Sequence, residues 1–317
     1  MRYLVTGGAG FIGSNTVDEL VRRGHDVTVL DDLSTGSESN VAGVSGSIDL
    51  IIDSITDRPM LERSCRGADY VLHLAARTSV PRSVQDPIET NQVNVDGTLG
   101  VLLAAREAGV RRVVFASSSA VYGDTPTLPK REDMPLAPIS PYGVSKLVGE
   151  LYGNVFQHIY GIEFGALRYF NVFGPRQNPD SPYSGVLSLF AAALRDGLSA
   201  KVFGDGEQSR DFTFVRNVVE LNIRACETPG ISGIAFNGGT GGRYTLNYTL
   251  QLLEKFAGRS ANAIYVEPRK GDIRDSQADI SLARQKLAYD PRIEFEEGLR
   301  RTWDWYRAEA EAPATSA

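Results

Sequence analysis

The sequence predicts an α/β fold, with a doubly wound parallel sheet and a smaller, mixed α/β lobe. Short apolar strands alternate with helical stretches in the first half, a glycine-rich turn follows the first strand, and loops dominate from about Phe170. The expected strands are Tyr3–Val5, Val27–Leu30, Leu50–Ile52, Tyr70–Leu74, Val113–Ala116 and Phe164–Leu167. The expected helices include Ser14–Arg23, Asn91–Gly109, Tyr142–Tyr160, Gly185–Asp196 and Tyr248–Phe256.

A glycine-rich turn joins the first strand to the first helix. Its spacing fits Gly8-x-Gly10-x-x-Gly13 and also Gly7-x-x-Gly10-x-x-Gly13. Glycines at such a turn let the backbone approach a pyrophosphate closely, and the pyrophosphate then rests on the N-terminus of the helix. The order of strand, turn and helix therefore predicts a dinucleotide-binding site.

The second strand ends in an acid, Asp31. It lies about twenty residues beyond the glycines, where a carboxylate binds the adenosine ribose diol. The residues that follow, Asp32–Gly36, include no lysine or arginine. A 2′-phosphate would be repelled there, so the sequence favours NAD over NADP.

Tyr142 and Lys146 are the candidate catalytic pair. Their i, i+4 spacing places both on one face of a helix that Pro141 can start. A free tyrosine titrates near pH ~10, and a nearby lysine charge lowers that pKa by favouring the phenolate. A serine from the upstream run Ser117-Ser118-Ser119 can share the proton. These groups are suited to removing a proton from an alcohol.

Together these motifs resemble the extended short-chain dehydrogenase/reductase family, and within it the NAD-dependent UDP-sugar 4-epimerases. The resemblance covers almost the whole chain. Besides the Tyr142/Lys146 pair, the matching segments are 6–13, 31–36, 73–76, 94–98, 117–123 and 168–176. It implies a Rossmann-type fold and an isomerase of carbohydrate metabolism. Such an enzyme inverts C4 of a UDP-hexose such as UDP-glucose, or of a UDP-N-acetylhexosamine such as UDP-N-acetylglucosamine, through a 4-keto intermediate.

The resemblance also assigns residues to the cofactor and to catalysis. Ser118, Tyr142 and Lys146 would be catalytic, and Lys146 would also contact the nicotinamide ribose. One departure concerns the adenine: Ser54 stands where the family usually has an aspartate. The implied cofactor-binding residues are Gly7, Gly10, Phe11, Ile12, Gly13, Asp31, Asp32, Leu33, Ser34, Thr35, Gly36, Ser54, Ile55, Leu74, Ala75, Ala76, Thr78, Asn94, Ser118, Tyr142, Lys146 and Phe170.

The same resemblance implies a nucleotide-sugar site. Arg210 and Arg269 would clamp the diphosphate, Asp272 would hold the uridine ribose, and Asn171 would touch the phosphate side. The segment Lys201-Val202-Phe203 would flank the uracil. The full set of implied substrate residues is Ser119, Asn171, Val186, Lys201, Val202, Phe203, Gln208, Arg210, Arg269, Asp272 and Ser276.

Ser276 bears on which sugar fits. In these epimerases the residue four after the ribose-binding aspartate lines the pocket near the C2 substituent, and counting from Asp272 gives Ser276. A serine leaves room for an N-acetyl group, whereas a tyrosine would crowd it. Ser79–Ser83 also resembles the segment of epimerases that act on N-acetylated sugars. We therefore expect both the acetylated and the plain pair to react. The alternative is that Ser276 is a neutral pocket residue and that the enzyme prefers plain hexoses.

The domain boundary follows the change in pattern. Residues 1–170 are expected to form the NAD-binding domain, to which the chain returns near 212–237. Residues 171–317 would form mainly the nucleotide-sugar lobe. The tail 308–317 is expected to be frayed.

Composition excludes several other classes. A net charge of −6 without a basic stripe argues against nucleic acid and anionic membranes as partners. No signal peptide or membrane-length apolar run is recognised. Cys65 and Cys226 lack the spacing of metal or redox sites and indicate a reducing cytoplasm. The three histidines are scattered, so no metal is expected.

A homodimer through 91–109 and 142–160 is expected from the resemblance alone.

Other reactions of nucleotide sugars remain alternatives. Related 4,6-dehydratases carry Asp-Glu just after the active-site Ser or Thr, and a decarboxylating relative needs a Glu, but Ser118 is followed by Ser119-Ala120-Val121. Uronate 4-epimerisation stays open. A non-catalytic NAD-binding relative usually loses the tyrosine or the lysine, and this chain keeps both.

Overall fold

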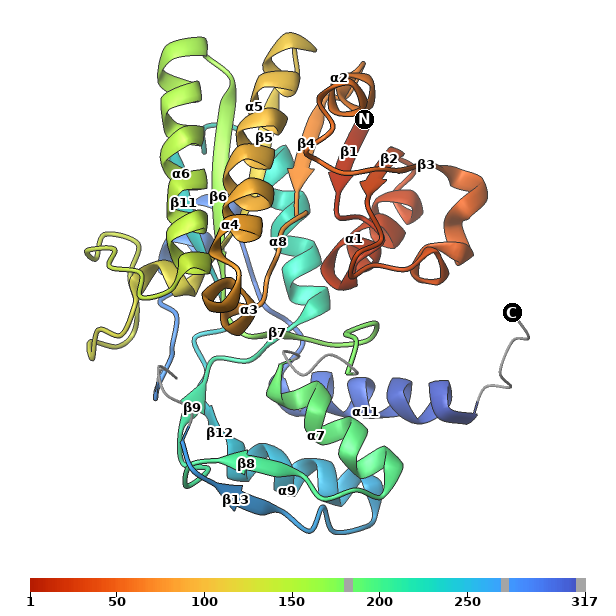
Figure 1. The fold of residues 1–317 in the computed structure, drawn as a ribbon, viewed down its shortest axis with the longest axis vertical. Coiled ribbons are helices and arrows are strands. Elements are labelled where there is room, and N and C mark those ends of the chain that lie inside the picture. The colour runs from red at the N-terminus through yellow and green to blue at the C-terminus, as the bar shows by residue number, and fades with distance from the viewer. Residues whose placement is uncertain (180–184, 269–273, 312–317) are drawn as a thin grey trace.

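A seven-stranded parallel sheet forms the larger lobe of the computed structural model, which describes residues 1–179, 185–268 and 274–311 (Figure 1). The strand order is β11-β6-β5-β4-β1-β2-β3. This order confirms the predicted doubly wound sheet. The strand order reverses at β1, so ligands are expected at the carboxyl ends of the strands around β1. The strands are β1 (Arg2–Thr6), β2 (Asp26–Asp31), β3 (Ile48–Ile52), β4 (Tyr70–His73), β5 (Arg112–Ser118), β6 (Glu163–Tyr169) and β11 (Ile234–Gly238).

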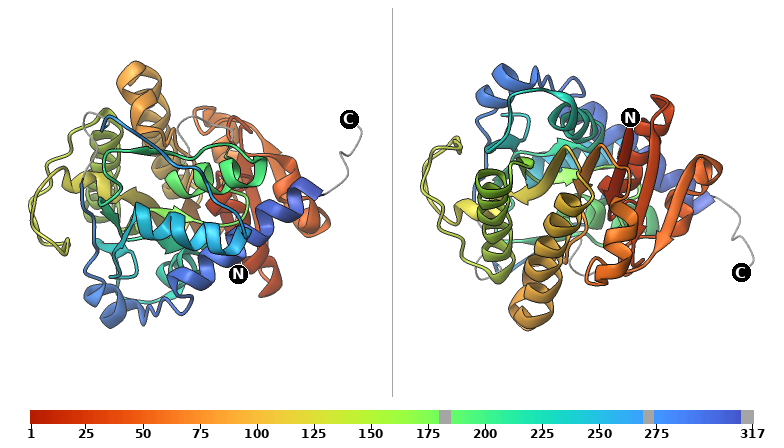
Figure 2. Two further views of the ribbon diagram at one scale, coloured as in Figure 1. Left: turned by 90° about the horizontal axis from the view of Figure 1, so that it is seen from below. Right: turned by 90° about the horizontal axis from the view of Figure 1, so that it is seen from above.

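Helices cover both faces of this sheet (Figure 2). Successive side chains of a strand point to opposite faces, so Tyr3 and Val5 join one core while Leu4 joins the other. On the Tyr3 face lie α1 (Phe11–Arg22), α8 (Val215–Glu227) and α10 (Ser281–Leu287). On the Leu4 face lie α2 (Arg58–Cys65), α5 (Gly97–Glu107) and α6 (Pro141–Tyr160). Shorter helical segments are α3 (Val80–Gln85), η1 (Glu38–Asn40), η2 (Ala42–Ser47) and η4 (Ser119–Tyr122).

The helix predicted at 91–109 is confirmed, but it begins earlier and contains a π-helical segment. The chain forms α4 (Pro87–Asn91), a π-helical segment η3 (Gln92–Asp96) and then α5. Asn94 lies inside the π segment, is 2% exposed, and uses its side chain to bind the backbone of Arg77. Thr98 Oγ1 donates to the Asn94 carbonyl at 2.6 Å. Such wide turns are frequent at functional sites, and this one follows from bonds to residues far away in sequence.

The smaller lobe lies beyond the carboxyl ends of the sheet strands, at the bottom of Figure 1. An aromatic core fills it, including Phe173, Phe190, Phe212, Phe295 and Trp303. Its helices are α7 (Val186–Asp196), α9 (Leu246–Ala257) and α11 (Phe295–Glu311). Its paired strands are β7 (Val172–Phe173) with β10 (Thr213–Phe214), β8 (Lys201–Phe203) with β13 (Ile264–Val266), and β9 (Ser209–Arg210) with β12 (Tyr244–Thr245).

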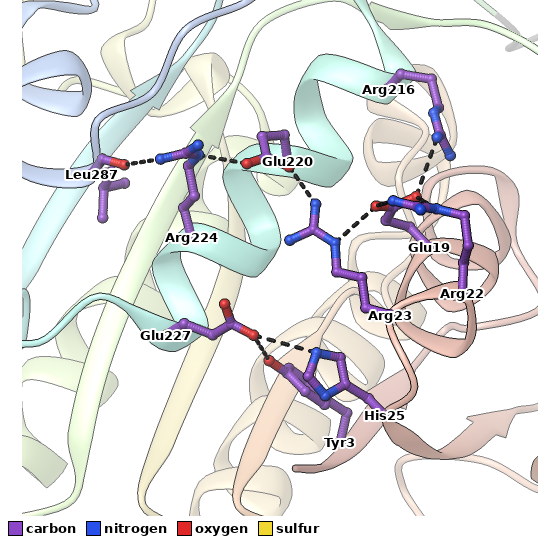
Figure 3. A network of polar contacts seen from close by, with 10 residues as sticks. All are labelled: Tyr3, Glu19, Arg22, Arg23, His25, Arg216, Glu220, Arg224, Glu227 and Leu287. Carbon is purple, nitrogen blue, oxygen red and sulfur yellow. Dashed lines mark hydrogen bonds and ion pairs between the residues drawn. The ribbon is translucent and has the colours of Figure 1, made fainter.

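A polar network ties α8 to α1, the helix that follows the glycine turn (Figure 3). Glu19, whose side chain is 5% exposed, pairs with Arg22, Arg23 and Arg216. Arg23 also pairs with Glu220 of α8 at 2.5 Å. The hydrogen bond from Arg22 and the charges of the other arginines lower the pKa of Glu19 to about 2. The chain enters α8 from the smaller lobe, and these ion pairs fix α8 to α1, the first helix of the larger lobe.

None of the helices in the described part of the chain has the length and apolar character needed to cross a membrane.

Candidate active site

The turn between β1 and α1 has the shape that a pyrophosphate requires. Gly7 has φ +72°, and a Cβ there would lie 2.8 Å from the Ala75 nitrogen. A Cβ on Gly13 would lie 2.0 Å from the Gly7 carbonyl oxygen. Gly10 is the N-cap of α1 and contributes no side chain over the first turn. The backbone of Gly7–Gly13 therefore forms an open cradle at a helix N-terminus, and NAD fits this cradle by shape and by charge.

Asp31 is held beside this cradle at the end of β2. Its carboxylate accepts the backbone N–H groups of Ala9 at 2.9 Å and of Leu33 at 2.8 Å. Burial raises the pKa of Asp31, and these hydrogen bonds oppose the rise. Each carboxylate oxygen has a second lone pair, so the group can still accept the two hydroxyls of a ribose.

The other predicted cofactor residues follow the carboxyl edge of the sheet in two groups. Leu74, Ala75, Ala76 and Thr78 follow β4, where Ala75 N donates to Thr6 Oγ1 at 3.3 Å. The loop after β2 comprises Asp32, Leu33, Ser34, Thr35 and Gly36, and the loop after β3 contains Ser54 and Ile55.

Four of the predicted cofactor residues direct their side chains into the hydrophobic cores. Phe170 is 0% exposed and packs against Tyr122, and its backbone N–H donates to the Gly238 carbonyl at 3.1 Å. Phe11 and Ile12 pack against the aromatic core of the smaller lobe. Ile55 is buried in the core of the Leu4 face, while Ser54 Oγ bonds Thr56 Oγ1 at 2.8 Å.

Ser118, Tyr142 and Lys146 meet where β5 ends and α6 begins. Ser140 caps α6 by accepting from Gly143 N, and Pro141 occupies its first turn. Tyr142 N donates to the buried Ser83 Oγ at 3.1 Å, which fixes the start of the helix. The Tyr142 hydroxyl is hydrogen-bonded to Ser118. One turn later, Lys146 Nζ donates to the Ala116 carbonyl at 2.8 Å and lies 5.8 Å from the Tyr142 ring centroid.

The pKa shifts in this group differ from the sequence-based expectation. Burial raises the pKa of Tyr142, and its hydrogen bond with Ser118 opposes the rise only partly. Burial lowers the pKa of Lys146 to about 7. The expected lowering of the Tyr142 pKa by Lys146 is therefore wrong for these residues alone, because burial disfavours both charged forms. Forming the phenolate calls for a further positive charge close to the ring.

A buried ion pair between β6 and α6 supports the elements that carry Ser118, Tyr142 and Lys146. Arg168 of β6 donates to Glu150 of α6 at 2.7 Å and 3.0 Å, and their side chains are 5% and 6% exposed. Glu150 also accepts from Ser117 Oγ at 2.5 Å. Sequence reasoning missed Glu150 as a support. The available signal was its place four residues beyond Lys146, on the same helix face as Tyr142.

A cavity of about 890 Å³ opens in the smaller lobe, between the ends of β8 and β13. Phe203, Gln208, Arg210 and Tyr265 are among its lining residues. Gln208 Nε2 donates to the Phe203 carbonyl, whereas the buried Gln208 Oε1 has no partner within the described ranges. Arg210 Nη1 donates to the Arg274 carbonyl at 2.6 Å. An unsatisfied buried acceptor beside an arginine suits a ligand that has both N–H or O–H donors and negative charge.

The remaining predicted substrate residues do not all lie at this cavity. Asn171 Nδ2 donates to Ser276 Oγ at 3.0 Å, so these two meet although they are far apart in sequence. Lys201 is exposed, but the Val202 side chain is 0% exposed in the lobe core and faces away from the cavity. Ser119 is the first residue of η4, directly after Ser118, and Val186 is the first residue of α7. Arg269 and Asp272 lie outside the described residues.

Comparisons with known proteins agree with this geometry. Residues 3–239 match the NAD dependent epimerase/dehydratase family. The UDP-glucose 4-epimerase of Mycolicibacterium smegmatis is 40% identical over 311 residues, which cover 97% of this chain and 99% of that protein. A structure of UDP-N-acetylglucosamine 4-epimerase from Methanobrevibacter ruminantium M1, in complex with UDP-N-acetylmuramic acid, superimposes with a TM-score of 0.93. It is 39% identical and covers 97% of this chain and 98% of that one. The UDP-glucose 4-epimerase of Thermotoga maritima with UDP-glucose also has a TM-score of 0.93, at 38% identity over 98% of this chain and 100% of that one.

Proposed function

The chain belongs to the NAD dependent epimerase/dehydratase family, and we propose that it is an NAD-dependent UDP-sugar 4-epimerase. The observation that carries this proposal is the meeting of Ser118, Tyr142 and Lys146 at the sheet edge that also bears the glycine cradle. A proton acceptor and a dinucleotide site then lie on the same side of the sheet. That is the arrangement needed to oxidise a secondary alcohol and reduce it again.

Tyr142 takes the proton of the sugar 4-hydroxyl, and Ser118 shares it through its hydrogen bond with the same phenol. When bound, NAD would accept the hydride from C4 and return it, and its oxidised nicotinamide would carry a positive charge. Such a charge would favour the phenolate, which burial of Tyr142 disfavours. The 4-keto sugar would turn over while its diphosphate stays held, so that the hydride returns to the opposite face of C4 and Tyr142 returns the proton to the O4 oxygen.

The cavity near β8 and β13 would hold the nucleotide. Arg210 and Arg269 would clamp the diphosphate, because a guanidinium offers a charged fork to phosphate oxygens. Lys201 and Phe203 would flank the uracil, and Asp272 the ribose. Gln208 Oε1, which has no hydrogen-bond partner among the described residues, supports this assignment, since a donor on the nucleotide would satisfy it.

The small Ser276 side chain would leave room for an acetamido group at C2. Ser276 is 8% exposed and is anchored by Asn171, so it keeps its place beside the predicted phosphate side of the site. We infer that UDP-N-acetylglucosamine and UDP-N-acetylgalactosamine are interconverted, and that UDP-glucose and UDP-galactose are accepted too.

Two broader features belong to the same proposal. Residues 1–170 would bind NAD and residues 171–317 mainly the nucleotide sugar. A homodimer would form through the helices at 91–109 and 142–160. On α6, Val144, Leu151 and Ile159 are 48%, 57% and 63% exposed at helical spacing, which supports this proposal. The two cysteines are buried free thiols, which suits a reducing cytoplasm.

A substrate panel tests the proposal. The purified protein is incubated with UDP-glucose, UDP-N-acetylglucosamine and UDP-glucuronate, and C4 epimers are separated by chromatography. We expect epimers of the first two. Product from UDP-glucuronate alone, or dehydrated products only, would replace the proposal by one of the related reactions.

A further inference from the structure

Arg77 joins the two sides of the dinucleotide site. Its backbone follows β4, whereas its guanidinium reaches the loop after β2. There Nη1 donates to Ser34 Oγ, and Nη2 lies 3.5 Å from the Asp32 carboxylate. On the near side, Nε donates to Glu89 of α4 at 3.0 Å. One side chain thus links three segments of the larger lobe.

The two segments that Arg77 joins lie on either side of the strand that leads into the glycine cradle. In the sheet, β1 lies between β4 and β2. Adjacent strands are about 4.8 Å apart, so β4 and β2 are separated by about 10 Å. The backbone of Arg77, after β4, and its contacts in the loop after β2 therefore flank β1, whose carboxyl end leads into Gly7–Gly13.

The starting point of Arg77 is fixed. Its N–H donates to Asn94 Oδ1 at 2.7 Å, and its carbonyl accepts from Asn94 Nδ2 at 3.0 Å. Asn94 also donates to Ser145 of α6 at 3.0 Å, next to Lys146. The backbone of Arg77 is thus held by a buried amide, whereas its side chain is 20% exposed and is held through polar contacts of the guanidinium.

We propose that Arg77 is a latch that retains the cofactor by closing over the dinucleotide at the glycine cradle. A guanidinium has five N–H donors, and the contacts with Ser34, Asp32 and Glu89 leave at least two for the pyrophosphate. Release of the dinucleotide then requires these ion pairs to open first. The latch rests on the proposed epimerase function, in which NAD is regenerated in every cycle and slow release does not limit turnover.

The neighbouring Arg82 provides a matched control. Arg82 pairs with the same Glu89 at 2.9 Å, but in the described part of the chain it makes no contact with Asp32 or Ser34. Arg77→Gln therefore removes the latch, while Arg82→Gln removes an equal charge from the same cluster. Glu89→Gln weakens the anchor of Arg77 without touching the cradle.

The readout is cofactor exchange. Each protein is purified with its bound NAD, mixed with excess isotopically labelled NAD, and the label bound is followed over time after rapid desalting. We expect Arg77→Gln to exchange roughly ten-fold faster than wild type, Glu89→Gln to fall between them, and Arg82→Gln to match wild type. Raising the salt concentration should speed exchange in wild type more than in Arg77→Gln, because salt screens the ion pairs of the latch.

The latch and the proposed function fail in different ways. If wild type holds NAD and epimerises sugars while Arg77→Gln and Glu89→Gln exchange at the wild-type rate, the latch is refuted and the function stands. Equal acceleration by Arg77→Gln and Arg82→Gln would also refute it, since general charge would then be the cause. If wild type binds no NAD, both fall.

Discussion

Replacing Glu150 by glutamine should destabilise the protein strongly, because it leaves a buried arginine without a counter-charge. Glu150 accepts from Arg168 Nε, Arg168 Nη2 and Ser117 Oγ, and both partners of the ion pair are about nineteen-twentieths buried, at 5% and 6% exposure. Removing one partner of such a pair typically costs about 3–5 kcal/mol. A glutamine keeps the shape and some hydrogen bonds, so we expect the lower end, about 3 kcal/mol.

The same reasoning predicts a rescue. When both members of a buried pair become apolar, the loss is often small, since no uncompensated charge remains. Glu150→Leu combined with Arg168→Met should therefore be more stable than either single variant. Glu62→Gln is the exposed control. It breaks the pair with Arg58, whose side chain is 57% exposed, and should cost less than about 1 kcal/mol.

Urea unfolding followed by far-ultraviolet circular dichroism measures these differences. Tryptophan fluorescence is unsuitable here, because Trp303 and Trp305 both lie in α11 of the smaller lobe. A change of less than about 1 kcal/mol for Glu150→Gln, similar to the exposed control, would refute the buried-pair reasoning.

The remaining predictions concern acid stability and sugar choice. Glu19 has its folded-state pKa lowered from 4.5 to about 2, so it stabilises the fold above pH 4.5, and this contribution of at most about 3 kcal/mol is lost as the pH falls toward 2. Glu19→Gln should flatten the decline in unfolding free energy between pH 4.5 and about pH 2, where the wild-type carboxylate loses its advantage, and an unchanged slope would contradict the arginine cluster. Ser276→Tyr should abolish turnover of the N-acetylated UDP-sugars and spare the plain hexoses, as measured by epimer yield, whereas equal loss on both pairs would contradict the pocket assignment.

Local patterns predicted the parts of the site that form from neighbouring residues. The glycine turn, Asp31 and the start of α6 at Pro141 each depend on residues within one strand-turn-helix unit. The helix at 142–160 was predicted despite Gly149 and Gly153, and its packing explains them. A Cβ at Gly153 would lie 2.1 Å from the Phe164 ring, so glycine lets α6 approach the sheet.

Contacts between distant segments could not be read from the sequence. The π-helical break at Asn94 arises from its bonds to Arg77, seventeen residues away. Arg77 reaches Ser34 across forty-three residues, and no local pattern signals that path. The raised Tyr142 pKa likewise depends on burial by several elements, which the Tyr-x-x-x-Lys spacing does not show.

Replacing Tyr142 by phenylalanine tests the central claim most directly, because it removes one hydroxyl from the group formed with Ser118 and Lys146. The measurement is kcat on UDP-glucose, made on protein whose bound NAD and circular dichroism match wild type. Loss of a positioned proton-transfer group predicts a decrease of roughly 10²–10⁴-fold. Near wild-type turnover in the NAD-loaded, folded variant would contradict the account, since the proton would then leave the sugar through another residue.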